Sequence, residues 1–316
     1  MLRFTVRRLL NMVLVMIALS VLVFVIFNVI PGGDPALRIA GRNANEVVRE
    51  QVREDYGFND PLYVQYLTLM QKTIDGELIS YSNQLNVREE IVRGLPATLS
   101  LVIGAGIIWL SLGVIFGVVS ARYAGRLPDR LLNILALIGI SMPVFWVGLM
   151  LLYYLSFRVE AFPPGGYTPL TEDPLDWLYH LALPWFALSI LFIGLYSRVL
   201  RSNVLDVSNE DYVRTARAKG LSERRVLVRH TLRNALIPVV TLFGLDLGQV
   251  IGGGAILTES VFDLQGVGTY AASSIGSLDL PPIMGTVLYG GFAILLLNAV
   301  VDIAYAFLDP RIRLNE

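Results

Sequence analysis

The chain has 316 residues, of which 54% are hydrophobic and 16% are charged, and its mean hydropathy is +0.60. This composition excludes an ordinary soluble domain and indicates an integral membrane protein. With no cysteine and only two histidines, the chain has no disulfide framework and no thiolate or histidine-rich metal site. We expect no metal, no cofactor and no nucleic-acid partner.

Six apolar runs are long enough to cross a bilayer as helices, which takes about 20 residues each. They cover residues 9–29, 97–121, 131–157, 181–200, 236–257 and 283–308. The first run lacks a small-residue cleavage site between Asn28 and Pro31, so we interpret it as a retained span. Pro143 predicts a kink in the third run, because a mid-span proline leaves a carbonyl unpaired. The sequence therefore predicts an all-α membrane protein with six transmembrane helices.

The arginines outside the spans predict the orientation. They precede the first span, separate the second from the third and follow the sixth, at Arg3, Arg7, Arg8, Arg122, Arg126, Arg130, Arg311 and Arg313. The short loops on the other side carry mainly acidic residues, including Glu160, Glu172, Glu259 and Asp263. Arginine accumulates on the cytoplasmic side of membrane proteins. We therefore expect a multi-pass protein of the cell membrane with both termini in the cytoplasm.

This orientation divides the chain into four parts. Residues 1–30 are a short cytoplasmic segment and the first span, and residues 31–95 form a small helical segment outside the cell. Within that segment, Asn45, Gly57, Asp60 with Pro61, and Gly76 indicate helix starts and stops. Residues 96–310 hold five spans, with Pro96 expected in the first turn of the second span and a cytoplasmic loop at 202–235. Residues 311–316 are a cytoplasmic tail. The outer segment either closes the outer face or docks a soluble partner.

The loop contains the basic stretch "YVRTARAKGLSERRVLVRHTLRNALIP", residues 212–238. Ser208 and the acids after it predict a helix start, Gly220 a helix stop and Ser222 a second start. The second helix is expected to continue into the fifth span. Ala216 and Gly220, four residues apart, form a small-residue stripe that a partner's groove could approach. The alternative is a basic helix that rests on anionic membrane lipid.

At these residues the sequence resembles the cytoplasmic coupling loop of ATP-binding-cassette importer permeases, in the first-permease group for dipeptides, oligopeptides and nickel. Arg214-Thr215-Ala216 replaces the usual leading triplet, Gly220 matches, and Arg233 stands where the general pattern has proline. Further similarities are "NVIPGGDP", "GLPATLSL", "GGGAILTESVF" and "NAVVDIAYAFLDPRIR". Together they cover nearly the whole chain.

The resemblance implies a type I importer permease fold and a set of partners. These are a second, homologous permease subunit, two ATP-binding subunits, an extracytoplasmic solute-binding protein and a peptide substrate. ATP hydrolysis would belong to the partners, so this chain would have no catalytic residue. Its contacts with the ATPase are expected in the loop, at Tyr212, Thr215, Ala216, Lys219, Gly220 and Leu221.

Other functions are compatible with parts of the sequence. Neither Lys72 nor Lys219 follows a phosphate-binding glycine pattern, which excludes a P-loop ATPase. An intramembrane protease would need a metal or nucleophile motif that is absent. An ion-coupled secondary transporter and a membrane scaffold remain alternatives, as do nickel or glutathione in place of peptides.

The fifth span has one face of small residues, at Gly244, Gly248 and Gly252. Such a face usually means close helix packing, but it could also line a translocation path with Asp246 and Gln249. An acid inside a span needs a partner. For Asp246 this is either a structural hydrogen bond or the ammonium group of a peptide. Asp302 in the sixth span is interpreted as structural.

Overall fold

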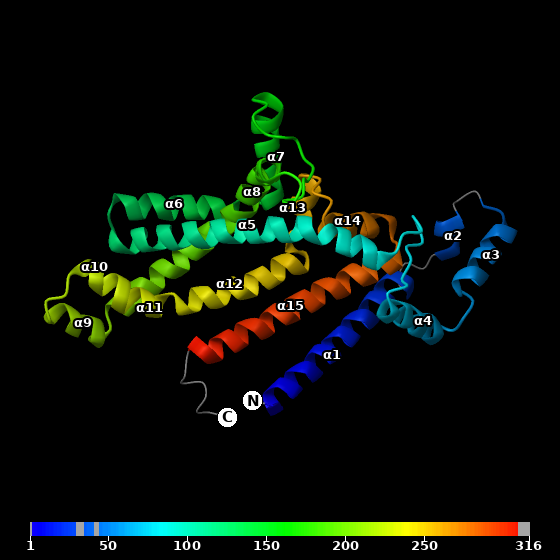
Figure 1. The fold of residues 1–316 in the computed structure, drawn as a ribbon, viewed down its shortest axis with the longest axis horizontal. Helices are drawn as coiled ribbons and strands as arrows, with labels where there is room; N and C mark the ends of the chain where they lie inside the picture. Colours follow the sequence, from blue (N-terminus) through cyan, green and yellow to red (C-terminus); the bar gives the residue numbers. More distant parts are fainter. Residues whose placement is uncertain (1, 30–34, 41–43, 309–316) are drawn as a thin grey trace.

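The computed structural model describes residues 2–29, 35–40 and 44–308, which fold into helices joined by short connections (Figure 1). Among these residues there is no strand, only an isolated bridge between Ile79 and Asn86. In the same part of the chain, five helices are long and apolar enough to cross a membrane, and there are six such spans if one bent helix pair is counted as a span. The predicted all-α membrane fold is confirmed.

The spans follow the order of the six apolar runs. They are α1 Leu2–Phe24 with η1 Val25–Val29, α5 Val87–Arg122, α6 Leu127–Ser141 with α7 Val144–Leu151 and η2 Leu152–Arg158, α8 Pro174–Ser208, α12 Ile237–Gln249 with η4 Val250–Gly254, and α15 Leu280–Leu308. Shorter helices connect them, namely α9 Asp211–Ala218, α10 Glu223–Val226, η3 Leu227–Thr231, α11 Leu232–Ala235, α13 Ile256–Val261 and α14 Val267–Ser277. The predicted tail at 311–316 lies outside the described residues.

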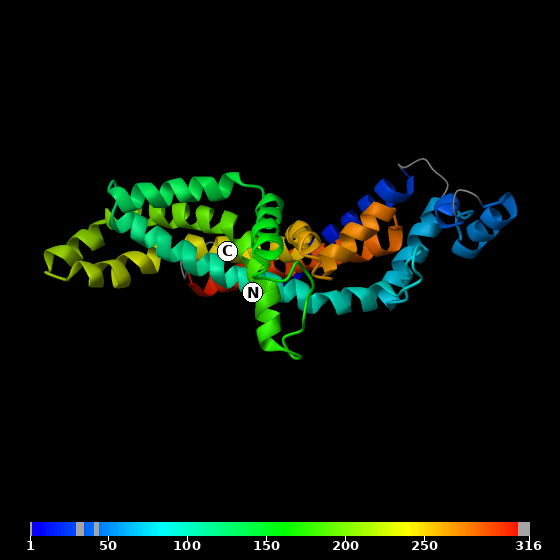
Figure 2. The ribbon, with the colours of Figure 1, turned by 90° about the horizontal axis from the view of Figure 1, so that it is seen from above.

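The third span is sharply bent. Its halves, Leu127–Ser141 and Val144–Arg158, meet at 98°. Met142 between them has an extended backbone, which is the conformation that a following proline favours. Pro143 thus confirms the predicted kink and turns α7 across the other helices (Figures 1 and 2).

The second span begins earlier than predicted. Asn86 caps α5 by accepting hydrogen bonds from the N–H groups of Arg88 and Glu89. Glu90 adds a further acid to the first turn, where the positive end of the helix dipole favours it. This start places Pro96 inside α5, so the expectation that Pro96 lies in the first turn is wrong.

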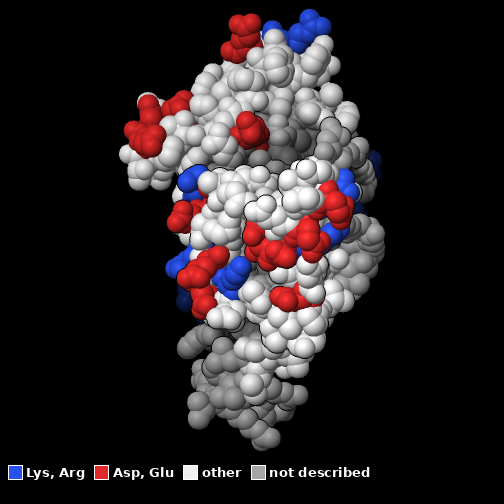
Figure 3. Space-filling model, turned by 90° about the vertical axis from the view of Figure 1, so that its right-hand side faces the viewer, with Lys and Arg blue, Asp and Glu red and all other residues white. Residues whose placement is uncertain are grey.

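Three short helices form a cap near one end of the molecule, namely α2 Pro35–Ala40, α3 Glu46–Tyr56 and α4 Leu62–Asp75. Asn45 caps α3, and left-handed Gly57 and Gly76 end α3 and α4, as predicted. The N-cap of α4 is Pro61, which provides no side-chain bond, so Asp60 is not the cap. Acidic and basic side chains are interspersed on this side of the molecule (Figure 3).

The helix bundle is elongated, and its two ends differ. The cap helices lie at one end and α9 to α11 at the other, in both views (Figures 1 and 2). Between them α5, α6 and α8 pack together, and α15 packs against α12 and α1. The bundle therefore separates the basic loop from the cap.

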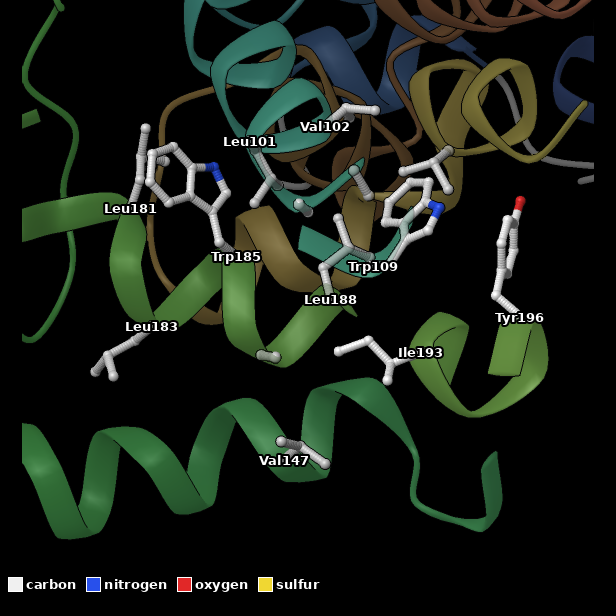
Figure 4. Packing of buried hydrophobic residues seen from close by; sticks show 14 of the residues in the cluster. Leu101, Val102, Trp109, Val147, Leu181, Leu183, Trp185, Leu188, Ile193 and Tyr196 are labelled. Atoms are coloured by element: carbon white, nitrogen blue, oxygen red, sulfur yellow. The ribbon is translucent and has the colours of Figure 1, made fainter. Parts of the chain in front are cut away.

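The main core lies between α5 and α8 (Figure 4). Trp109 and Tyr196 are fully buried there, and Leu188 is 2% exposed. A Cβ at Gly113 of α5 would lie 2.6 Å from the Cβ of Tyr196. The absence of a side chain at Gly113 thus allows the close contact of the two helices.

Candidate coupling surface and substrate cavity

The basic loop folds into a compact unit, residues 209–235, which we call the basic hairpin. Gly220 has a φ of +78°, and this left-handed backbone follows the end of α9 as predicted. Ser222 precedes α10, also as predicted. The expected start at Ser208 is wrong, because its hydroxyl donates to the Val204 carbonyl at 2.6 Å and α8 continues through it.

The hairpin has a small core of its own. Val213, Ala216 and Val226 are buried in it, and Leu221 packs against them. Ala216 is 5% exposed, whereas nothing lies within 4 Å of a Cβ built on Gly220. The two residues therefore do not form one exposed stripe, because Ala216 faces inward.

The outer face of α9 is formed by polar and small residues. Those exposed to solvent are Asp211, Tyr212, Arg214, Thr215, Arg217, Ala218 and Lys219, followed by Gly220. Of the six residues expected to contact an ATPase, four thus lie on this surface, while Ala216 and Leu221 support it from within.

Side-chain bonds hold the hairpin to the end of α8. Arg217 donates to the Ser208 carbonyl at 3.0 Å and pairs with Glu223 at 3.1 Å. Asn234 donates to the Tyr212 hydroxyl at 2.7 Å, which ties α9 to α11. These bonds connect α9 to the end of α8 and to α11, which directly precedes α12.

A buried ion pair lies at the same end of the bundle. Asp129, at the start of α6, is 3% exposed and receives two hydrogen bonds from Arg201 of α8, at 2.7 and 2.8 Å. It also accepts from the Ser120 hydroxyl, the Gly125 N–H and the Asn133 amide. Such a bidentate pair fixes orientation as well as distance. It joins the α5–α6 turn to the helix that carries the basic hairpin.

Toward the cap, the structure contains a cavity of about 1140 Å³ that opens on the surface. Its wall along α5 is apolar and exposed, at Leu99, Ile103 and Ile107. Trp177 and Trp185 of α8 form an aromatic wall. Pockets for small molecules measure roughly 300–1,000 Å³ and combine such walls with few polar groups. The cavity is thus large enough for a small organic solute.

The indole rings are held in place by Ser100 of α5. Trp177 donates to the Ser100 hydroxyl at 3.1 Å, and Trp185 donates to its carbonyl at 2.9 Å. A Cβ on Gly104 would lie 2.1 Å from the Trp185 ring, so only glycine fits there. The aromatic wall is therefore built into the fold.

A buried carboxylate supports the part of the wall formed by α14. Glu259 of α13 is fully buried and accepts hydrogen bonds from the Thr98 hydroxyl at 2.8 Å and the Thr269 N–H at 3.1 Å. The Thr98 hydroxyl in turn accepts from the Val267 N–H at 2.9 Å. Burial raises the pKa of Glu259, and the hydrogen bond from Thr98 opposes that rise. These bonds hold the start of α14 against α5.

The predicted path residues lie on α12 and η4. Gly248 and Gly252 pack against α15, where a Cβ on Gly252 would lie 2.5 Å from the Cγ1 of Ile294. Asp246 has a structural partner, the Tyr196 hydroxyl at 2.6 Å, while Gln249 is exposed. None of these four residues lines the large cavity. The side chain of Asp302 lies outside the described part of the chain.

Two features were missed in the sequence, namely the Asp129–Arg201 pair and the cavity. An acid and an arginine at the ends of apolar runs were a usable signal for the pair. Nothing local in the sequence indicated that Trp177 and Trp185 share a cavity with α5. Glu259 was counted only as an acid of an outer loop.

The apolar spans, the basic hairpin at one end and the open cavity nearer the other define a multi-pass membrane permease. The chain belongs to the family described as binding-protein-dependent transport system inner membrane component. Residues 113–314 match that family model, and residues 1–102 match the model of its N-terminal part. The family resemblance predicted from the sequence is confirmed.

Two relatives extend over almost the whole chain. The oligopeptide transport system permease protein of Bacillus subtilis is 38% identical and aligns over 98% of each chain. The probable D,D-dipeptide transport system permease protein of Escherichia coli is 37% identical, over 96% of this chain and 95% of its own.

A solved structure supports the fold. The MetNI methionine ABC transporter, in an inward-facing conformation, matches with a TM-score of 0.53 and 15% identity. The match covers 69% of this chain and 96% of that chain. The type I importer permease fold expected from the sequence is thereby confirmed.

Proposed function

We propose that this chain is one permease subunit of an ATP-driven importer that carries dipeptides or oligopeptides across the cell membrane. The main support for the proposal is the basic hairpin. Its α9 helix presents an exposed surface, packs on a small apolar core and is hydrogen-bonded to the end of α8. The relatives named for oligopeptide and D,D-dipeptide transport favour peptides over nickel or glutathione.

The proposed complex contains a second homologous permease, two ATP-binding subunits and a solute-binding protein. The α9 surface, with Tyr212, Thr215, Lys219 and Gly220 exposed, would dock into an ATP-binding subunit on the cytoplasmic side. ATP binding would draw the docked hairpins together, and α8 would transmit that movement to the cavity. The solute-binding protein would deliver peptide from outside, and both termini would lie in the cytoplasm. Hydrolysis would take place in the ATP-binding subunits, not in this chain.

Ala218 offers a direct test of docking. It is exposed on α9, and unlike left-handed Gly220 it accepts a side chain without backbone strain. In the reconstituted complex we expect Ala218→Trp to lower peptide-stimulated ATP hydrolysis and dialanine uptake by about tenfold, the effect of a ~1.4 kcal/mol loss of docking affinity.

The matched control is Ala124→Trp, at an exposed position of the α5–α6 turn outside the hairpin. It should leave both activities near the wild-type level. Full uptake by a stably inserted Ala218→Trp variant would refute docking through α9 and would favour a hairpin that rests on lipid.

A further inference from the structure

The cavity lining contains an ion pair whose two side chains differ in solvent exposure. Glu90 and Arg93, on the first turns of α5, are the charged residues among those that line it in the described part of the chain. Their ion pair spans 2.7 Å, and the side chain of Arg93 is 70% exposed while that of Glu90 is 17% exposed. The Arg93 member of the pair is held mainly in solvent, where an ion pair contributes little. A ligand cation could therefore replace the Arg93 guanidinium at the Glu90 carboxylate at little cost in free energy. The half-buried Glu90 is the member of the pair that would bind such a ligand.

A second polar group reaches the cavity from a strained loop. Asp263 and Gln265 both have positive φ, at 48° and 54°, although neither is glycine. Leu264 between them is fully buried, and its N–H donates to the Glu259 carbonyl at 3.0 Å. Burying Leu264 thus holds this backbone in place and leaves the exposed Gln265 on the cavity lining. Strain of this kind is retained where the surroundings enforce it, often at ligand sites.

Resting on the proposed peptide transport, we propose that this cavity binds the N-terminal end of a short peptide, with the Glu90 carboxylate as partner of the free α-ammonium group. Gln265 offers both a donor and an acceptor, which suits the first peptide bond. Trp177 and Trp185 provide an apolar wall for the first side chain. The sequence suggested this role for Asp246, which is bonded to Tyr196 and does not line the cavity, and our proposal assigns the role to Glu90 instead.

The absence of native cysteine allows a direct occupancy measurement. Ser273 is exposed and lines the cavity, so Ser273→Cys can be modified there by a thiol reagent. In the assembled transporter we expect dialanine to slow this modification, and N-acetyl-dialanine to slow it far less. Gln71→Cys, on the exposed face of α4 outside the cavity, is the control whose modification dialanine should not affect.

The role of Glu90 is then tested in the Ser273→Cys background. We expect Glu90→Gln to raise the dialanine concentration for half-protection by about tenfold, Glu90→Asp to raise it less, and Arg93→Gln to change it less than about threefold. An unchanged value in Glu90→Gln, or equal protection by N-acetyl-dialanine, would overturn the assignment. If either result occurred while the wild-type complex still took up dialanine, only the assignment of Glu90 would be refuted. If the wild-type complex took up no peptide at all, the proposed function would be refuted as well.

Discussion

Asp129 and Glu259 are both buried carboxylates, but only Asp129 is paired with a cationic side chain. Asp129, near the basic hairpin, pairs with Arg201 through two short hydrogen bonds. Glu259, beside the cavity, accepts its bonds from the Thr98 hydroxyl and from backbone N–H groups at the start of α14. No cationic side chain pairs with Glu259 among the described residues. The start of α6 is thus joined to α8 by an ion pair with further hydrogen bonds, and the start of α14 is joined to α5 by hydrogen bonds without a cation.

The largest effect is expected when the Asp129 pair is broken. Arg201→Met should destabilise the chain by about 3 kcal/mol, the lower end of the range for a buried pair, because Asp129 loses its cation while Arg201 is partly exposed. The thermal midpoint of the detergent-purified protein should fall clearly. Arg198→Met, which removes an exposed arginine from the same helix, should have little effect. Equal midpoints for the two variants would mean that the pair does not hold the helices together.

A smaller effect is expected at the Glu259 site. Thr98→Val removes the donor to Glu259 and the acceptor of the Val267 N–H, and leaving such a buried group unbonded costs about 1–3 kcal/mol. Thr286→Val is the matched control, because that buried threonine bonds only within its own helix. If Thr98→Val lowered the thermal midpoint as much as Arg201→Met, the contrast between the two sites would be lost.

Local chemistry made much of the fold predictable. Apolar length located the spans, Pro143 the bend in the third, and Gly220 the turn in the hairpin, because each depends on residues next to it in the chain. The start of α5 was misplaced because Asn86 caps it well before the apolar run begins.

The contacts of the candidate site depend on the tertiary fold and could not be predicted in the same way. Arg201 lies 72 residues from Asp129, and Thr98 lies 161 residues from Glu259. The inward position of Ala216 follows from how α9 closes on α10, which its short sequence does not determine. Asp246 was correctly expected to need a partner, but the sequence could not identify Tyr196 as that partner.

The central claim is that the cavity end and the hairpin end face opposite sides of the membrane. Single cysteines can report this in a chain without native cysteine, at Glu172 in the loop before α8 and at Arg225 of α10, which is outside the α9 docking surface; both are exposed. With an impermeant maleimide on intact cells, we predict that Glu172→Cys is labelled and that Arg225→Cys is labelled only after the membrane is permeabilised. Labelling of Arg225→Cys in intact cells, with Glu172→Cys protected, would contradict the proposed orientation and the docking of the hairpin to a cytoplasmic ATPase.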